Sequence, residues 1–439
     1  MTHPAGLLHR TDSQARRIEI RLLQVMAGRA RLCHEPGLER AVIFQDKLAF
    51  VFNRHARYES PMSQTLDDLP TPALILDRAI LRRNLKRMSD RLREAGVLLR
   101  PHLKTAKSVQ IGRMAVEGHD GRITVSTLAE ARYFAEGGFK DIFYAVGVVP
   151  SKLPAVTELR RQGVNLRVVT DNIAVARAIA DAAKNGDTFS VFIEVDSGGG
   201  RAGLPYPELP GLLDIARVLH NVPGVELAGV MTHAGHSYHE STIDGIAAVA
   251  EQERLAIVTA AEKIRAAGIP CPIVSGGSTP TAMHSRDFTG ITEMRPGVYC
   301  FNDLDQEYIG SCGAGDLALS VLASVIGHYP HRNQVLIDAG ALALSKDISA
   351  QEFQPKVGFG TIADAPAKDM AVIACSQEHG FVQSDDPIPY GNLPIGSRVR
   401  VMPNHACITA AAYDRYYVVD SELDGGKTVV DTYDRINGW

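Results

Sequence analysis

Residues 100–107 read RPHLKTAK and follow directly on an apolar run, so they are the first segment in which to look for chemistry. Side chains alternate along a β-strand, which predicts Arg100, His102 and Lys104 on one side of a strand that ends here. Pro101 lacks an amide donor and suits such an end. A lysine that is buried and crowded by Arg100 and His102 has a lowered pKa and can form a Schiff base. The alternative is an ordinary solvated strand end, and the segment alone does not decide between the two.

A glycine-rich turn, SGGSTPT at 275–281, is the second candidate. The amides of Gly276 and Gly277 and the hydroxyls of Ser278 and Thr279 can cradle a phosphate group. Two further polar loops, DSGGGRAG at 196–203 and MTHAGHSY at 231–238, supply Arg201, His233, His236 and Tyr238. All these segments follow predicted strands, and enzymes built on parallel barrels collect their sites at that end.

The third candidate is the segment PNHACIT, which holds His405 and Cys407. The two residues are two positions apart in a strand-like run, so their side chains are predicted to face the same way. An imidazole and a thiolate are both metal ligands, and a catalytic metal keeps positions open for water and substrate. A His-x-Cys pair also occurs in packed cores, so the residues alone leave both possibilities open.

The elements that must position these residues are short apolar runs at about 97–100, 123–126, 142–145, 166–169, 189–195, 226–232, 272–275 and 291–294. Helical patterns, with apolar residues three and four apart, lie between most of them. Eight strands alternating with helices predict a (β/α)8 barrel, with a doubly wound open sheet as the alternative. After residue 310, strand-like runs separated by Gly, Pro, Asn and Asp predict a mostly β domain.

The predicted organisation has four parts. Residues 1–61 form a basic N-terminal extension, which is predicted to be poorly ordered. Residues 62–77 are a lead-in strand expected to pack on the β domain, 78–308 are the barrel, and 309–439 are the C-terminal β domain with the metal pair.

Composition narrows the class of protein. The net charge of −4 and pI near 6.4 provide no field that would gather nucleic acid or an anionic membrane. The six cysteines are far apart and form no CxxC motif, which favours a reducing compartment. No apolar stretch approaches the length of a membrane span, and no signal peptide is recognisable. We expect a cytoplasmic protein that binds small polar molecules.

Seven motifs in order give the chain a specific resemblance: TPALILD, RPHLKTAK, STLAEARYFAEGG, MTHAG, GGSTPT, EMRPGVY and PNHAC. Together they resemble the fold type III, alanine-racemase-like enzymes that use pyridoxal phosphate (PLP), and within them the D-serine dehydratase and D-threonine aldolase branch. The resemblance implies that Lys104 bonds to the cofactor. It implies a phosphate site at Gly276, Gly277, Ser278 and Thr279, and cofactor contacts from His102, Arg201, His233, Tyr238 and Arg295. Arg295 is expected to face the pyridine nitrogen, with His233 behind it.

The same resemblance implies the metal and the reaction. Its dehydratases carry a His-x-Cys pair that binds zinc, whereas its aldolases tend to carry His-x-Asp and a harder divalent metal. His405 and Cys407 therefore imply zinc, with another divalent metal possible, and a D-serine dehydratase-like lyase that converts a small D-3-hydroxy amino acid to a keto acid and ammonia. Aldol cleavage of D-threonine or 3-hydroxy-D-aspartate is the alternative. A non-catalytic PLP-binding protein is the alternative from another class, and a homodimer with shared sites is implied.

Overall fold

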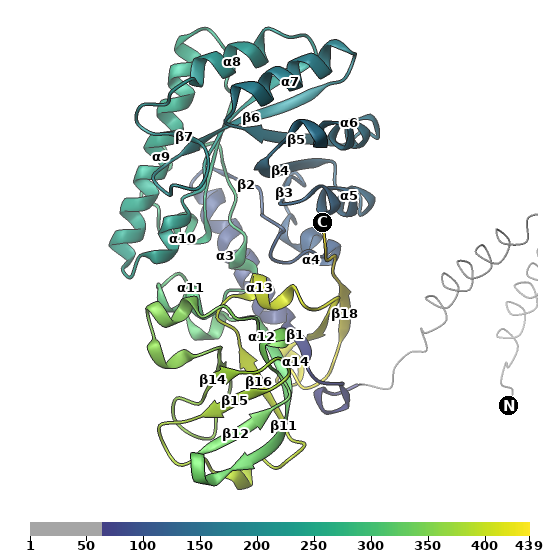
Figure 1. The fold of residues 1–439 in the computed structure, drawn as a ribbon, viewed down its shortest axis with the longest axis vertical. Helices are drawn as coiled ribbons and strands as arrows, with labels where there is room; N and C mark the ends of the chain where they lie inside the picture. The colour runs from purple at the N-terminus through teal and green to yellow at the C-terminus, as the bar shows by residue number, and fades with distance from the viewer. Residues whose placement is uncertain (1–63) are drawn as a thin grey trace, which may run out of the picture. The chain divides into compact units, whose positions relative to one another are not determined.

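In a computed structural model of the protein, residues 64–439 are described, and the predicted extension at 1–61 lies outside them. This part of the chain contains two nine-stranded sheets, one with parallel strands and one mostly antiparallel (Figure 1). The strands of the parallel sheet lie between residues 98 and 294, and the antiparallel sheet combines a strand before them with strands after them. No helix among these residues is long and apolar enough to cross a membrane.

Eight strands of the parallel sheet coincide with the eight apolar runs of the sequence. Their order is β2-β10-β9-β8-β6-β5-β4-β3, with bounds β2 (Leu98–Leu99), β3 (Ile123–Val125), β4 (Asp141–Gly147), β5 (Asn165–Thr170), β6 (Phe189–Asp196), β8 (Val225–Met231), β9 (Ile273–Gly276) and β10 (Glu293–Met294). A short ninth strand, β7 (Leu204–Pro205), pairs with the end of β6.

The two ends of this sheet meet just beyond β2. His102 forms a parallel bridge with Thr124 of β3. The Thr124 amide donates to Pro101 O at 2.9 Å, and the Leu103 amide donates to Thr124 O at 2.8 Å. This closure confirms the predicted (β/α)8 barrel and excludes the open sheet.

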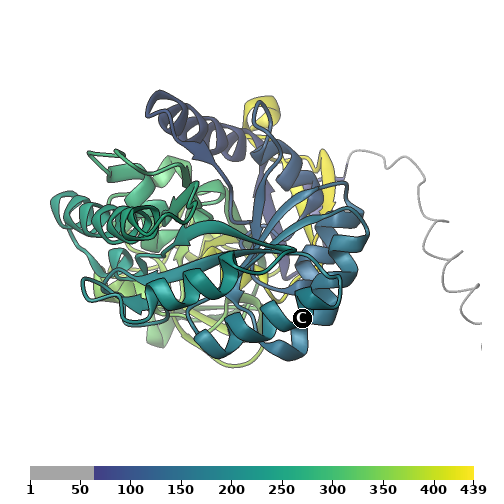
Figure 2. The ribbon, with the colours of Figure 1, turned by 90° about the horizontal axis from the view of Figure 1, so that it is seen from above.

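Helices surround the barrel, as the view from above shows (Figure 2). They are α3 (Arg78–Glu94), α4 (Val109–Ala115), α5 (Leu128–Glu136), α6 (Leu153–Arg161), α7 (Ile173–Lys184), α8 (Leu212–His220), α9 (Ile243–Ala266), α10 (Thr279–His284) and α11 (Leu304–Tyr308). Polar side chains cap several of their first turns: Asp77 accepts from two amides of α3, and Asn172 from two amides of α7. Each helix then turns an apolar stripe toward the strands, and burial of that stripe holds the helix in place.

The second sheet confirms the predicted β domain. Its strands are β1 (Ala73–Asp77), β11 (Leu319–Tyr329), β12 (Gln334–Ile337), β13 (Thr361–Ile362), β14 (Ala371–Cys375), β15 (Gly380–Gln383), β16 (Arg398–Met402), β17 (Arg415–Val419) and β18 (Asp431–Asp434). Six of them close into a small barrel through the β11–β12 pairing, and β1, β17 and β18 extend the sheet beyond β11. Three short helices accompany them: α12 (Ala341–Leu344), α13 (Ala406–Ala410) and α14 (Ser421–Asp424).

The turn that carries Lys104 is attached to the β domain. Tyr416 Oη of β17 donates to Ala106 O at 2.6 Å, and the Ile436 amide donates to Lys107 O at 2.9 Å. Arg435 Nε in turn donates to Tyr416 Oη at 2.9 Å. These hydrogen bonds from the β domain therefore fix the position of the lysine turn at the mouth of the barrel.

Candidate active site

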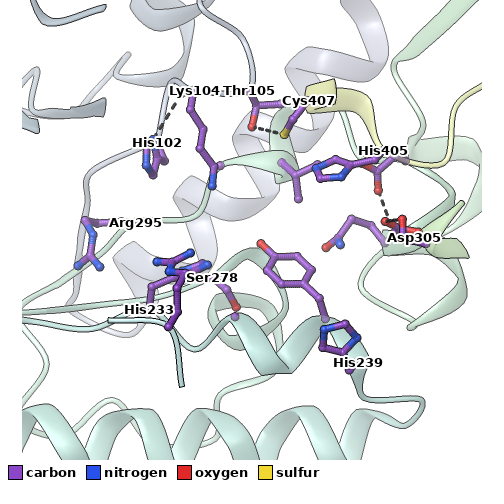
Figure 3. Close-up of a pocket in the computed structure, with 18 residues that line it drawn as sticks. His102, Lys104, Thr105, His233, His239, Ser278, Arg295, Asp305, His405 and Cys407 are labelled. Carbon is purple, nitrogen blue, oxygen red and sulfur yellow. Dashed lines mark hydrogen bonds between the residues drawn. The ribbon is translucent and has the colours of Figure 1, made fainter. Parts of the chain in front are cut away.

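A recess lies where the carboxyl ends of the barrel strands meet the β domain. It consists of two adjoining cavities of about 310 and 370 Å³. Both cavities are lined by His102, Lys104, Arg201, His233 and Arg295, and the first is also lined by Tyr238, Ser278, His405 and Cys407. Figure 3 shows Lys104 and His405 extending into this cavity from different walls. Ten of the twelve predicted site residues line the recess, whereas Gly276 and Thr279 do not.

The lysine reaches the recess by a different route from the predicted one. Strand β2 ends at Leu99, and Lys104 lies in the turn after the closing bridge, not on a strand. Arg100 does not crowd it, because the guanidinium is fully buried and ion-paired with Glu293 at 2.9 Å and Asp141 at 2.6 Å. The prediction that Arg100 lies beside Lys104 on one side of a strand was therefore wrong. Alternation holds only while the chain stays extended, and Pro101 marks the place where it stops.

Two histidines of the recess are held in the neutral form. Burial lowers the pKa of His102 and of His233 well below the usual range, and the positive charges of Lys104, Arg201 and Arg295 lower both further. His102 Nδ1 also accepts the Lys104 amide at 3.4 Å. Both imidazoles therefore act near neutral pH as uncharged hydrogen-bonding groups.

Arg295 is buried at the floor of the recess and anchored at both terminal nitrogens. One donates to Ser275 Oγ and the other to the backbone oxygen of Thr232. Burial lowers its pKa to about 10, with the carboxylates of Glu293, Glu253 and Glu194 opposing that effect. The side chain thus remains a fixed cation at neutral pH.

The glycine-rich turn differs in one respect from the predicted phosphate cradle. The Gly277 amide donates to Glu253 Oε1 at 2.9 Å, and the Ser278 amide donates to Thr281 Oγ1 at 2.9 Å, so both are already engaged. The Ser278 hydroxyl is engaged as well, since it accepts the Thr281 amide at 3.2 Å and lies 2.9 Å from Ser237 Oγ. Ser278 nevertheless lines the cavity together with Tyr238, whose hydroxyl contacts Thr279. Gly277 is required by geometry, since its φ is +103° and a Cβ there would lie 2.9 Å from the Arg295 amide.

Glu253 is a residue of the site that the sequence analysis missed. It lies on α9, and its Oε1 accepts the amides of Gly277 at 2.9 Å and Ala234 at 3.1 Å. Burial raises its pKa, and these two hydrogen bonds oppose the effect. It therefore joins the glycine-rich turn to the loop of His233. The available signal was an acidic residue in the otherwise apolar buried stripe of a helical pattern.

Glu194 is a second missed residue, and it lines the larger cavity. It lies near the end of β6, on the same face as Phe192, which packs inside the barrel. Burial raises its pKa, and the charges of Arg201 and Arg295 oppose that effect. Strand parity applied to FSVFIEVD would have placed this carboxylate in the barrel mouth.

The predicted metal pair comes together, but not on a strand. Strand β16 ends at Met402, His405 caps α13 and Cys407 is in its first turn. Strand alternation is therefore not what brings the two side chains together. They converge because both lie at the start of α13. Burial would lower the pKa of His405, but the charge of Cys407 and the bond to Asp347 raise it to about 11. Burial would raise the pKa of Cys407, and the charge of His405 lowers it instead.

Three aspartates surround this pair, and none of them is among the predicted site residues. Asp347 Oδ2 contacts His405 Nδ1 at 2.9 Å, while Asp303 Oδ2 accepts the Ala406 amide at 2.8 Å. Asp305 accepts the Ser349 hydroxyl at 2.6 Å through Oδ2, and its Oδ1 has no partner. Within residues 64–439, no group of three or more metal-ligating side chains is close enough to hold an ion by itself.

The buried carboxylate of Asp305 should make the stability of the metal-free protein depend on pH. Burial, with the charge of Asp303 adding to it, raises the pKa of Asp305 from 3.8 to about 7. The folded state thus favours the protonated form, so this stabilisation is complete below pH 4 and is lost as the pH rises through 7. Asp305→Asn should flatten the fall in free energy of unfolding between pH 4 and 7, measured by urea titration. Asp364→Asn, at an exposed carboxylate of the β domain, should leave the slope unchanged.

Comparison with known proteins agrees with this geometry. Residues 76–305 match the family model described as alanine racemase, N-terminal domain, and residues 318–419 match a serine dehydratase domain model. D-threo-3-hydroxyaspartate dehydratase from Delftia sp. HT23 is 42% identical over 386 residues, which cover 86% of this chain and all of the relative. Its solved structure superposes with a TM-score of 0.81, and a cysteine-to-alanine mutant of it is known in a metal-free form.

Two further relatives show the range of the group. D-serine dehydratase from Dictyostelium discoideum is 34% identical over 379 residues, covering 81% of this chain and 95% of the relative. D-threonine aldolase from Filomicrobium marinum has a solved structure that is 25% identical, with a TM-score of 0.73 over 85% of this chain and 97% of that one.

The barrel, the β domain and the lysine-lined recess between them define an alanine-racemase-like enzyme that depends on PLP. Among such enzymes, the chain belongs to the family of lyases that join this barrel to a serine dehydratase domain. Dehydratases and aldolases of D-hydroxy amino acids both occur among its relatives.

Proposed function

We propose that the protein is a metal-dependent dehydratase that converts a D-3-hydroxy amino acid to a keto acid and ammonia, with zinc at His405 and Cys407. The observation that carries the proposal is that one cavity contains both a lysine and an imidazole–thiol pair. A base that removes the α-proton and a Lewis acid at the β-hydroxyl are the two groups that β-elimination of water needs.

The residues of the recess fit PLP. Its phosphate would lie beside Ser278 and Tyr238, which line the cavity, and the fixed cation of Arg295 would face its ring nitrogen. The cofactor, when bound, supplies an aldehyde that bonds to amines and a ring that withdraws electrons. An arginine facing the ring nitrogen keeps that nitrogen unprotonated and weakens the withdrawal, so the reaction needs help at the leaving group.

Lys104 is the base in this proposal. Its amine enters the recess between two neutral imidazoles, His102 and His233, which place no additional positive charge beside it. This amine could take the α-proton on its own side of the substrate. The proton remains on the Lys104 amine while the β-hydroxyl leaves.

The donor set of His405 and Cys407 fits zinc. A thiolate selects zinc over Mg²⁺ or Mn²⁺, and two protein ligands leave positions for water and the β-hydroxyl. The charge of His405 lowers the pKa of Cys407, which favours the thiolate form that binds a metal. A metal held there supplies Lewis acidity that makes the hydroxyl a better leaving group. The metal-free form known for a cysteine mutant of the Delftia relative supports a metal in this group of proteins.

Incubation with D-serine, D-threonine and D-threo-3-hydroxyaspartate tests the function directly. We expect keto acid and ammonia in stoichiometric amounts, loss of both on chelation, and recovery with zinc. Glycine together with an aldehyde, which is glyoxylate in the case of 3-hydroxyaspartate, would instead establish the aldolase. Failure to turn over any of the three by the PLP-loaded, zinc-loaded protein would favour a binding protein without catalysis.

Changing Cys407 to aspartate should shift the metal preference. Carboxylate oxygen is a harder donor than thiolate, so Cys407→Asp should weaken zinc binding and favour Mn²⁺ or Mg²⁺. Competition titrations with each metal measure the change. Cys375→Ala, at a half-buried thiol outside the recess, should leave the metal preference unaltered. An unchanged preference in Cys407→Asp would mean that this side chain is not a ligand.

A further inference from the structure

Each member of the metal pair is contacted by one polar side chain from another part of the chain. Asp347 Oδ2 lies 2.9 Å from His405 Nδ1, and Thr105 Oγ1 lies 3.1 Å from Cys407 Sγ. We propose that Asp347 and Thr105 are positioning residues, one for each ligand, which set the orientation of the imidazole and the thiolate for the metal. The inference rests on the proposed metal site at His405 and Cys407.

Asp347 is itself firmly held. Its Oδ1 accepts the Ser349 amide at 2.9 Å, and its backbone oxygen accepts the Asn404 side-chain amide at 3.0 Å. The carboxylate is only 17% exposed. A carboxylate fixed in this way accepts a proton from Nδ1 and so assigns the tautomer of the ring.

That tautomer leaves the other ring nitrogen, Nε2, to act as the ligand. Asp347 occupies Nδ1, and the imidazole lines the same cavity as Cys407, so Nε2 is the nitrogen that remains for a metal. An anionic acceptor at Nδ1 also makes the ring a stronger donor to a cation at Nε2. Asp347 therefore contributes both orientation and basicity.

Thr105 connects the metal pair to the lysine turn. It is fully buried, it follows Lys104 directly, and its hydroxyl reaches a thiol 302 residues further along the chain. The same turn is tied down by Tyr416 and Ile436 through the neighbouring carbonyl groups. The hydroxyl thus sets the position of Cys407 relative to Lys104, and so the distance between the proposed metal and the proposed base.

Zinc affinity of the PLP-loaded protein, measured by competition with a chromogenic chelator, tests the proposal without reference to turnover. We expect His405→Ala to lose the site. Asp347→Ala and Thr105→Val should each bind zinc about 10–100-fold more weakly, the usual cost of losing an outer hydrogen bond to a metal ligand. Asp347→Asn keeps an acceptor oxygen but not the charge and should fall between wild type and Asp347→Ala. Thr105→Ser keeps the hydroxyl and should restore nearly wild-type affinity.

Matched controls separate positioning from general destabilisation. Asp420→Asn alters a buried, ion-paired carboxylate of the same domain, and Thr157→Val removes a buried hydroxyl far from the recess. Both should bind zinc like wild type, and thermal melts should show which variants are folded. The conservative variants, Asp347→Asn and Thr105→Ser, keep the test decisive if a larger change unfolds the protein.

The outcomes distinguish this inference from the function on which it rests. Wild-type affinity in folded Asp347→Ala and Thr105→Val, with loss in His405→Ala, overturns the positioning roles and leaves the metal site standing. Equal weakening in Thr105→Ser and Thr105→Val also overturns the role of the hydroxyl. A wild-type protein that binds no zinc, or a His405→Ala variant that binds it unchanged, removes the metal site and this inference together.

Discussion

Replacing Lys104 by alanine should reduce keto acid formation by at least about 10³-fold, because a single side chain is assigned both the covalent bond to the cofactor and the removal of the α-proton. The measurement is kcat on D-serine and D-threo-3-hydroxyaspartate with saturating PLP and zinc. Borohydride reduction followed by peptide mapping should leave the cofactor on Lys104 in the wild type and on no residue of this turn in the variant.

Lys107 provides the matched control. It lies three residues further in the same turn, and its amine is ion-paired with Glu130 at 3.2 Å instead of entering the recess. Lys107→Arg keeps that charge and should retain both the borohydride-trapped cofactor and most of the activity. A Lys104→Ala enzyme with wild-type turnover would disprove the proposed chemistry, whatever the substrate.

Removing the metal pair should have the second-largest effect. His405→Ala, Cys407→Ala and chelation of the wild type should each lower kcat by about 10²–10³-fold, because Lewis acidity at the leaving hydroxyl is worth several kcal/mol. Spectra of the cofactor and its binding affinity should change little, since its proposed contacts lie elsewhere in the recess.

Zinc should restore the chelated wild type but neither variant. Cys375→Ala again serves as the control, and it should lose activity on chelation and regain it with zinc as the wild type does. Full activity of metal-free His405→Ala would exclude a metal in the reaction and favour direct protonation of the hydroxyl by a side chain of the recess. Asp305, with its pKa raised to about 7, would then be the first candidate for that acid.

Local patterns in the sequence were sufficient for the fold class and for most of the residues that line the recess. The eight strands follow from short apolar runs with helical periodicity between them, since strand and helix place side chains at different periods. Lys104, Arg201, His233 and Ser278 could be selected because each follows such a run, and in a parallel barrel all these ends meet. The His405–Cys407 pair was found from residue type, although its secondary structure was not.

Tertiary structure alone decided which groups control these side chains. The sequence placed Arg100 beside the lysine, whereas in the structure its guanidinium pairs with Glu293, 193 residues away. Asp347 and His405 are 58 residues apart, and Thr105 and Cys407 are 302 apart. No local periodicity encodes such pairings, because they depend on how the two domains pack. Packing removes water from some polar groups, and those groups must then find partners within the protein. The sequence by itself therefore determined which residues could take part in the chemistry, whereas packing determined their partners, their charge states and their orientation.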